Sequence, residues 1–215
     1  MGAYKNNFVL NFVRQAFSTK ENPPYYQLQK KHLNNVVVLP TRIDLLEQLP
    51  KNAIIAEVGV AKGRFSEKIL NITRPKTLHL IDSWQSKLFG NKARTLVQDR
   101  FKKQIELGIV KVRHGCSTDV LFSFPDKYFD WVYLDTDHTY TTTHKELELC
   151  RQKVKPGGII AGHDYTPRHY RNGNVFGVAE AVNEFCFKHS WKFVLLTHET
   201  HRHLSFALKK IGKKD

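Results

Sequence analysis

The sequence predicts an α/β protein whose doubly wound, mainly parallel sheet has seven strands and includes an antiparallel C-terminal hairpin. Three observations predict this fold. Short apolar runs recur from residue 53 onward, and helical patterns separate the first five of them. Each separating segment is long enough for the crossover helix that parallel strands require. The last two runs have no helical pattern between them, which favours an antiparallel pair at one end of the sheet.

The predicted elements follow one another in a simple order. The five alternating strands are assigned to residues 53–58, 77–81, 109–113, 129–134 and 158–161. A helix is expected over 175–189, followed by the hairpin strands at 191–196 and 204–208. The polar segment 198–203 separates these last two strands.

The N-terminal part is expected to be a helical extension, residues 1–45, of a domain that spans 46–215. Apolar residues recur at helical spacing over 4–17, so this helix would pack on the domain or join two copies of the chain into a homo-oligomer. A proline-rich break follows at 22–25, and a second helix is expected to begin near Thr41. A length of 215 residues suits one such domain.

Composition limits the partners and the compartment. The formal net charge of +14 favours anionic partners such as phosphorylated metabolites, nucleic acid or acidic glycans. The three cysteines lack CxxC spacing, so neither a disulfide framework nor a structural zinc site is expected. The apolar run near the N-terminus, residues 8–10, is too short for a signal peptide or a membrane span. These features predict a soluble, cytoplasmic protein with no membrane partner.

A glycine-containing loop follows the first predicted strand. Glu57, Gly59 and Gly63 form the pattern Glu-x-Gly-x-x-x-Gly, and a helical pattern begins at Arg64. Glycines at a strand exit allow a tight turn and let a ligand approach the backbone, while the helix start presents free N–H groups. The spacing differs from that of the dinucleotide and phosphate-loop motifs, and the acidic residue favours a ligand with a positive or hydroxyl-bearing face.

Polar side chains also follow the second and third predicted strands. Asp82, Ser83 and Trp84 come at the end of the second strand, where a carboxylate can accept hydrogen bonds from both hydroxyls of a ribose. Trp84 would cover an adenine there; the alternatives are that Asp82 caps a helix and that Trp84 packs in the core. Cys116 and Ser117 follow the third strand, in a loop that commonly frames the edge of a purine.

The fourth predicted strand ends in the tetrad Asp135-Thr136-Asp137-His138. Strands of a parallel sheet open at their carboxyl ends into the ligand crevice, so two carboxylates and an imidazole there indicate chemistry. The alternative is a solvated turn in which Asp137 or Thr139 caps the next helix. His138 is the leading candidate for a general base, because the unperturbed pKa of histidine lies near neutrality.

Together these residues resemble the class I S-adenosylmethionine-dependent methyltransferases. The resemblance rests on Glu57-x-Gly59-x-x-x-Gly63, Asp82, Asp135 and the Lys-Pro-Gly-Gly segment 155–158, and it covers about residues 50–208. It implies a Rossmann-like methyltransferase fold with S-adenosyl-L-methionine as the cofactor. In that arrangement Gly59 and Gly63 cradle the methionine part, Asp82 holds the ribose, and Cys116 or Ser117 lies near the adenine.

A closer resemblance is to small bacterial O-methyltransferases with Asp-x-Asp-His after the fourth strand and Gly-His-Asp-Tyr, here 162–165, after the fifth. This group places the base at the position of His138 or of Asp137. Related sugar and macrolide O-methyltransferases bind magnesium with an acid at the position of Asp135 and an acidic pair at those of His163 and Asp164. The resemblance thus implies a metal site at these three residues. Because His163 replaces an oxygen ligand with nitrogen, magnesium, a softer ion and no ion all stay open.

The sequence therefore predicts an enzyme that methylates an oxygen of a small, polyhydroxylated, sugar-like acceptor. Because the net charge of the chain is positive, this acceptor could carry a negative charge. His138 or Asp137 would take the proton, and His163 could share that work. The alternatives are a nucleic-acid methyltransferase and a cofactor-binding protein without turnover. Residues 22–25, Asn-Pro-Pro-Tyr, match an amino-methyltransferase motif but precede the cofactor strand, so a proline turn is expected there.

Overall fold

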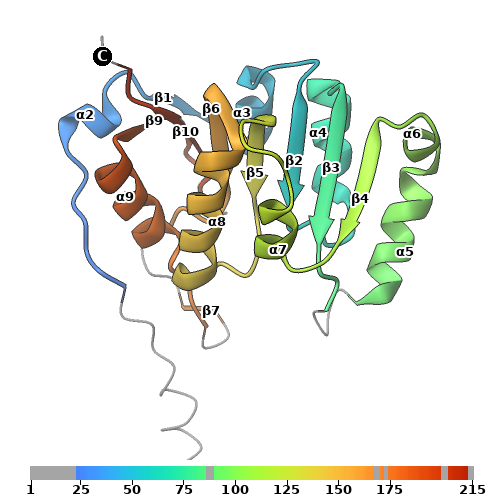
Figure 1. Cartoon of the computed structure of the whole chain (residues 1–215). Coiled ribbons are helices and arrows are strands. Elements are labelled where there is room, and N and C mark those ends of the chain that lie inside the picture. Colours follow the sequence, from blue (N-terminus) through green and yellow to red (C-terminus); the bar gives the residue numbers. More distant parts are fainter. Residues whose placement is uncertain (1–22, 86–89, 167–169, 172–173, 200–202, 213–215) are drawn as a thin grey trace, which may run out of the picture.

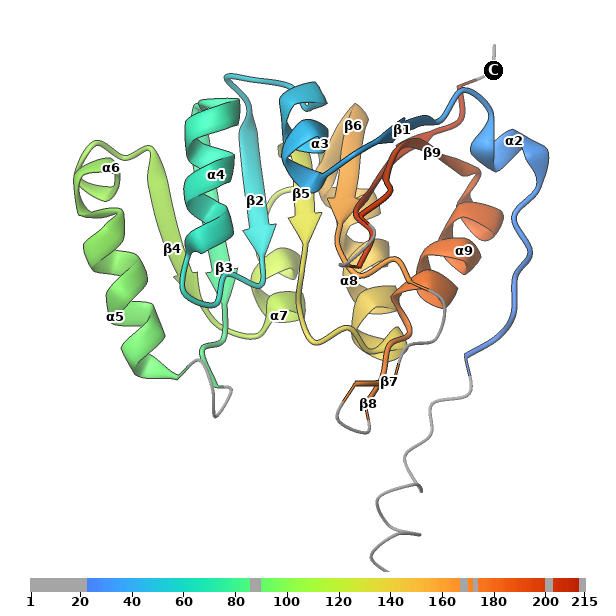
Figure 2. The same ribbon diagram turned by 180° about the vertical axis from the view of Figure 1, so that it is seen from behind.

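The computed structural model describes residues 23–85, 90–166, 170–171, 174–199 and 203–212 (Figures 1 and 2). Within these residues, eight strands form one sheet. In their order across the sheet they are β1 (Val37–Leu39), β9 (Trp191–Thr197), β10 (Phe206–Lys210), β6 (Val154–Gly162), β5 (Phe129–Leu134), β2 (Ile54–Val58), β3 (Thr77–Asp82) and β4 (Val110–His114). The helix predicted over 4–17 lies outside the described residues.

The pairing of these strands is parallel with one exception. Among the described strands of this sheet, β10 alone runs antiparallel, and it pairs with both β6 and β9. The prediction of a mainly parallel sheet with an antiparallel C-terminal hairpin is therefore confirmed. The carboxyl ends of β2, β3 and β5 lie together at the lower edge of the sheet in Figure 1.

Helices cover both faces of the sheet (Figures 1 and 2). One face carries α3 (Arg42–Gln48), α4 (Arg64–Thr73) and α5 (Asn91–Arg100), and the other carries α7 (Ser117–Phe122), α8 (Tyr140–Lys153) and α9 (Val178–His189). Each face has its own apolar core, because successive residues of a strand point to opposite sides. Ile55 and Tyr133 pack in the first core, and their chain neighbours Ala56 and Val132 pack in the second.

The remaining elements are short. The helix α2 (Lys30–Leu33) precedes β1, and α6 (Lys102–Glu106) follows α5. Two short strands, β7 (Tyr170–Arg171) and β8 (Asn174–Val175), form a separate antiparallel ribbon beside the N-terminal end of α8. None of the helices in the described ranges is both long enough and apolar enough to span a bilayer.

The sheet has one strand more than the seven predicted. Val37, Val38 and Leu39 pair in parallel with Leu195 to Thr197 of β9. The strand escaped prediction because it is only three residues long and lies in the segment expected to be helical. β1 belongs to the sheet and α3 packs in its first core, and the domain boundary at residue 45 stays a prediction.

The start of α3 is fixed by a capping box, as expected near Thr41. The Thr41 hydroxyl accepts hydrogen bonds from the N–H groups of Ile43 (3.2 Å) and Asp44 (3.4 Å), and the Asp44 carboxylate accepts from the N–H of Thr41 (2.9 Å). Glu199, which follows β9, accepts a 2.5 Å hydrogen bond from the N–H of Arg42. The first turn of α3 is thereby held against the sheet near the carboxyl ends of its strands.

Candidate active site

A cavity of about 700 Å³ opens at the carboxyl ends of β2, β3 and β5. This volume is in the range of small-molecule and cofactor sites. Nine of the predicted site residues line it: Glu57, Gly59, Asp82, Ser83, Cys116, Ser117, Asp135, Asp137 and His138. Gly63, Trp84, His163 and Asp164 are not among the residues that line it.

Gly59 is required by the close approach of two strand ends. Its φ is +90°, and a Cβ atom built on it would lie 1.9 Å from the carbonyl oxygen of Asp135. The N–H of Gly59 donates to Ile81 (2.9 Å), and the N–H of Asp135 donates to Val58 (2.8 Å), so β2, β3 and β5 are joined where the cavity begins. Any other residue at position 59 would push Asp135 out of place.

Gly63 has a different place from the one expected. It precedes α4 with a φ of +73°, and a Cβ atom there would lie 3.0 Å from the ring of Phe101 and 3.2 Å from Val97. The glycine thus allows the start of α4 to pack closely on α5. We therefore assign Gly63 to helix packing rather than to a wall of the cavity.

Asp82 joins the glycine loop to the end of β3. One oxygen accepts hydrogen bonds from the N–H groups of Val60 (2.8 Å) and Ala61 (2.9 Å), and the other accepts from the N–H of Trp84 (2.7 Å). A carboxylate has about four acceptor sites, so the second oxygen can still accept from a ligand hydroxyl. The position of Asp82 in the cavity wall agrees with the expected ribose contact.

Trp84 packs in the core, which was the alternative considered for it. Its indole N–H donates to the carbonyl of Ala61 (2.9 Å), and the side chain is 3% exposed. The left-handed backbone at this residue, with a φ of +44°, and the Asp82 hydrogen bond turn the ring under the glycine loop. In this structure Trp84 therefore supports the loop, and its contact with an adenine stays a prediction.

Glu57 lies under the cavity and is 1% exposed. Burial raises the pKa of Glu57 to about 8, although the neighbouring Ser66 hydroxyl acts in the opposite direction. One of its oxygens has no hydrogen-bond partner among the described residues. The folded protein thus holds a proton on Glu57 at neutral pH, which the unfolded chain releases.

Replacing Glu57 by glutamine is expected to change how stability depends on pH. The folded-state pKa is raised, so the wild-type contribution is fully present below about pH 4.5 and is lost as pH rises towards 8. Relative to wild type, Glu57→Gln should gain roughly 1 kcal/mol in the free energy of unfolding per pH unit across this window. Urea unfolding at pH 5, 6.5 and 8 checks this, with the exposed Glu47→Gln as the matched control. Equal pH profiles for Glu57→Gln and wild type would contradict the prediction.

Asp137 is engaged in the start of α8. One oxygen accepts from the backbone N–H and the hydroxyl of Thr139, both at 3.0 Å, and the other accepts from the hydroxyl of Thr142 (2.8 Å). Thr139 is the N-cap of α8 and accepts a hydrogen bond from the N–H of Thr142 (3.2 Å). The capping alternative thus describes Asp137 well, and its carboxylate is poorly placed to serve as a base.

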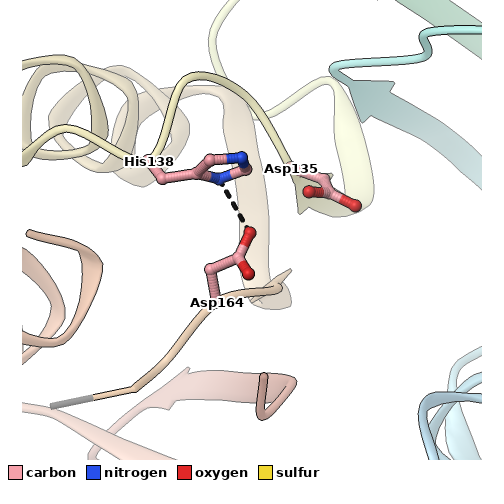
Figure 3. Close-up of side chains that lie close together, drawn as sticks. All are labelled: Asp135, His138 and Asp164. Atoms are coloured by element: carbon pink, nitrogen blue, oxygen red, sulfur yellow. Dashed lines mark ion pairs between the residues drawn. The ribbon is translucent and has the colours of Figure 1, made fainter. Parts of the chain in front are cut away.

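His138 and Asp164 form a hydrogen-bonded pair at the cavity (Figure 3). Nδ1 of His138 lies 2.7 Å from Oδ2 of Asp164. The imidazole also stacks on Phe176, with 4.9 Å between ring centroids and 6° between the planes. Burial by itself lowers the pKa of His138, but the hydrogen bond and the charge of Asp164 outweigh it, so the net shift is upward.

Asp164 lies among three imidazoles. Besides His138, Nδ1 of His163 lies 3.1 Å from Oδ1 of Asp164, and His203 contacts the same oxygen through its Nδ1. Burial alone would raise the pKa of Asp164, yet the hydrogen bonds with His138 and His163 hold it well below its usual range. Asp164 therefore stays ionised. Its carboxylate is expected to accept hydrogen bonds from the N–H groups of the surrounding imidazole rings.

Asp135 lies between these histidines and α3. Burial raises the pKa of its carboxyl, while His163, His138 and Arg42 act in the opposite direction. Its Oδ2 lies 3.6 Å from Nη1 of Arg42, and its Oδ1 lies 3.9 Å from Nδ1 of His163. Asp135, His138 and Asp164 each offer one atom within 4.8 Å of the others, a spacing that could hold a metal ion. The predicted metal set had His163 in the place of His138.

Three residues of the site were not predicted. Arg42, Phe176 and His203 lie close to Asp135, His138 and Asp164, respectively. In the sequence, only its position after the helix cap Thr41 could have suggested that Arg42 belongs to the site. Phe176 and His203 reach the site through contacts between elements distant in the sequence, so no local pattern indicates them.

The chain matches a known family over about half its length. The family described as "Methyltransferase domain" matches residues 56–165. No curated protein matches the chain at a significant level of sequence similarity.

Solved structures of similar fold include an O-methyltransferase and an rRNA methylase. The O-methyltransferase from Bacillus cereus in complex with S-adenosylhomocysteine (SAH) is 15% identical, with a TM-score of 0.58, over 98% of this chain and 94% of that one. An rRNA methylase from Streptococcus thermophilus is 12% identical, with a TM-score of 0.57, over 80% and 95%. The pyocyanin biosynthetic protein PhzM is 12% identical, with a TM-score of 0.58, over 79% of this chain but only 54% of its own. At these identities the likeness shows the fold.

Proposed function

The chain belongs to the methyltransferase domain family, and from this premise we propose that it methylates an oxygen of a small, polyhydroxylated, sugar-like acceptor with S-adenosylmethionine as the methyl donor. The observation that carries the proposal is the pairing of His138 with Asp164 at the wall of a cavity that also contains Gly59 and Asp82. The cavity thus combines a place where a ligand can approach the backbone with an oriented imidazole.

The cofactor part of the proposal is supported by the walls of the cavity. Gly59 leaves the backbone accessible at the end of β2, Asp82 offers a carboxylate at the end of β3, and Ser117 begins α7 beyond β4. The cofactor, when bound, supplies a methyl group on a positively charged sulfur. Acidic side chains near this region, chiefly Asp82 and Asp135, suit the positive charge of such a ligand.

The catalytic part of the proposal concerns His138. Ionised Asp164 accepts a hydrogen bond from Nδ1–H of His138, which leaves Nε2 as the nitrogen that can accept a proton from an acceptor hydroxyl. Stacking on Phe176 fixes the plane of the ring. When an acceptor hydroxyl gains the methyl group that the cofactor would supply, His138 would take the hydroxyl proton on Nε2.

A magnesium ion fits these residues poorly. Magnesium prefers a shell of oxygens, whereas Asp135, His138 and Asp164 offer two carboxylates and one imidazole, a set closer to the preference of softer ions. The oxygens of Asp164 already face three imidazoles. The proposed role of His138 therefore requires no ion.

Substitution of Asp137 separates the two candidate bases. Because its carboxylate is engaged by Thr139 and Thr142, Asp137→Asn should keep kcat within about threefold of wild type. Methyl transfer measured at saturating cofactor checks this. A fall of 100-fold or more, on the scale of a lost general base, would move the base from His138 to Asp137.

A nucleic-acid methyltransferase is the second candidate. It is favoured by the net charge of +14 and by the similar fold of an rRNA methylase. Labelled S-adenosylmethionine offered together with neutral sugars, sugar acids, nucleotide sugars and structured RNA distinguishes the two. Label in a polyhydroxylated small molecule supports the proposal, whereas label only in RNA overturns it, and cofactor binding without transfer to any acceptor points to a protein without turnover.

Two further expectations stay proposals. We propose a cytoplasmic location, which is supported by cysteines that are all free: Cys116, Cys150 and Cys186. We also keep a homo-oligomer formed through residues 4–17 as a proposal, which light scattering of the full chain and of a variant with polar residues at Phe8 and Phe12 tests.

A further inference from the structure

Arg42 is a cation in the wall of the cavity that none of the roles above uses. It is the first residue of α3, and its side chain is 23% exposed. The guanidinium lies over the ring of Phe65, 4.2 Å from the centroid, and Phe65 also lines the cavity. A long side chain stacked in this way is held in one orientation rather than free in solvent.

The backbone of Arg42 is also held in place. The capping box of Thr41 and Asp44 sets the start of α3, and Glu199 accepts a hydrogen bond from the N–H of Arg42. Phe65 is supported in turn by the ring of Tyr133, at 4.7 Å between centroids. The Arg42 side chain is therefore preorganised, so that less conformational entropy is lost when a ligand binds to it.

Arg42 and Asp135 form an ion pair without a direct hydrogen bond between them. The guanidinium Nη1 lies 3.6 Å from Asp135 Oδ2, whereas a hydrogen-bonded pair of these groups has a separation near 2.8 Å. Among the described residues, no acceptor is hydrogen-bonded to the guanidinium of Arg42. Its N–H donors are thus still available to a ligand that carries a planar anion.

A cation and an anion side by side suit a ligand with both charges. An α-amino acid group has a carboxylate and an ammonium on neighbouring atoms, and Arg42 and Asp135 offer a complementary pair at the same end of the cavity as Gly59. The other cations in the wall, Lys62 and Arg64, are exposed, so solvent screens their charge more strongly.

We propose that Arg42 is the carboxylate-binding residue for the amino acid part of the cofactor, with Asp135 beside it as the acceptor for the ammonium. The inference rests on the proposed function, because it assumes S-adenosylmethionine as the ligand. It assigns to the segment before the glycine loop a part of the cofactor site that the sequence motifs do not include. A bidentate pair of guanidinium and carboxylate then selects the intact amino acid group.

The test compares SAH with its decarboxylated analogue, which keeps the adenosine, the sulfur and the ammonium. Calorimetry with wild type should show about 10- to 100-fold tighter binding of SAH than of the analogue. Arg42→Met keeps a long side chain to pack on Phe65 and should bind both ligands equally, with the affinity that wild type has for the analogue. Arg100→Met removes an arginine paired with Glu67 outside the cavity and should keep the wild-type preference.

Four outcomes overturn the inference. Equal loss of affinity for both ligands in Arg42→Met would mean that Arg42 only supports the structure. A preserved preference for SAH in Arg42→Met, or its loss in Arg64→Met instead, would place the carboxylate elsewhere. Absence of SAH binding by wild type would overturn the proposed function as well, so failure of the two is distinguishable.

Discussion

Substitution of His138 by asparagine is expected to lower kcat for methyl transfer about 100- to 10,000-fold, the range for loss of a general base. Asparagine tolerates the left-handed backbone at this position, where φ is +66°, and its amide can still donate to Asp164. The variant therefore removes the nitrogen that takes the proton while it preserves the local structure. Single-turnover methyl transfer at saturating cofactor measures the effect.

The control for this experiment is cofactor affinity. His138→Asn should bind SAH within about threefold of wild type, because the loss concerns proton transfer and not uniform binding. Asp164→Asn should also lower kcat, since an amide oxygen holds the Nδ1 proton of His138 less strongly than a carboxylate. Full activity of His138→Asn would contradict the assignment of the base.

Substitution of Gly59 by alanine is expected to abolish cofactor binding, with SAH affinity reduced at least about 100-fold, and to cost about 3 kcal/mol in the free energy of unfolding. The added Cβ would lie 1.9 Å from the carbonyl oxygen of Asp135, and the backbone φ of +90° is unfavourable for alanine. Neither strain can be relieved without separating the ends of β2 and β5. Calorimetric titration with SAH and urea unfolding measure the two effects.

Gly108→Ala is the matched control for this variant. Gly108 also has a positive φ, +72°, but a Cβ atom there would meet nothing within 4 Å. It should lose only about 1 kcal/mol in the free energy of unfolding and should bind SAH like wild type. If Gly59→Ala behaved like Gly108→Ala, the close approach of Gly59 to Asp135 would have no importance for the site.

Much of the fold could be predicted because the relevant signals are local. The apolar run of β5 appears in the structure with the predicted bounds, Phe129–Leu134, and the predicted hairpin strands correspond to β9 and β10. Parallel pairing follows from the length of the crossover segments. The strand β1 was not predicted because it has only three residues, and its pairing with β9 depends on chain 158 residues away.

The site was predictable only where a residue acts at the end of its own strand. Gly59, Asp82 and Asp135 meet because carboxyl ends of parallel strands share one edge of the sheet. Gly63 and Trp84 do not line the cavity, because their neighbours, Phe101 and the carbonyl of Ala61, are set by packing between elements. These packing partners carry no signal in the local sequence.

The contacts of Asp164 also could not be predicted from the local sequence. The motif Gly-His-Asp-Tyr suggested a metal ligand, and Asp164 does lie near Asp135. The structure adds its hydrogen bond with His138, which orients the imidazole at the end of its strand. That pairing joins residues 26 positions apart along the chain, so the two motifs could not reveal it separately.

The most direct test of the account is a calorimetric titration of wild-type protein with SAH, performed with chelator and then with magnesium or manganese. Saturable one-to-one binding is expected in chelator, because Gly59, Asp82 and Asp135 line the cavity without an ion. If the protein bound SAH tightly only in the presence of a divalent ion, Asp135 and His138 would instead be assigned to a metal site. No binding under any of these conditions would contradict the central claim that this cavity holds S-adenosylmethionine.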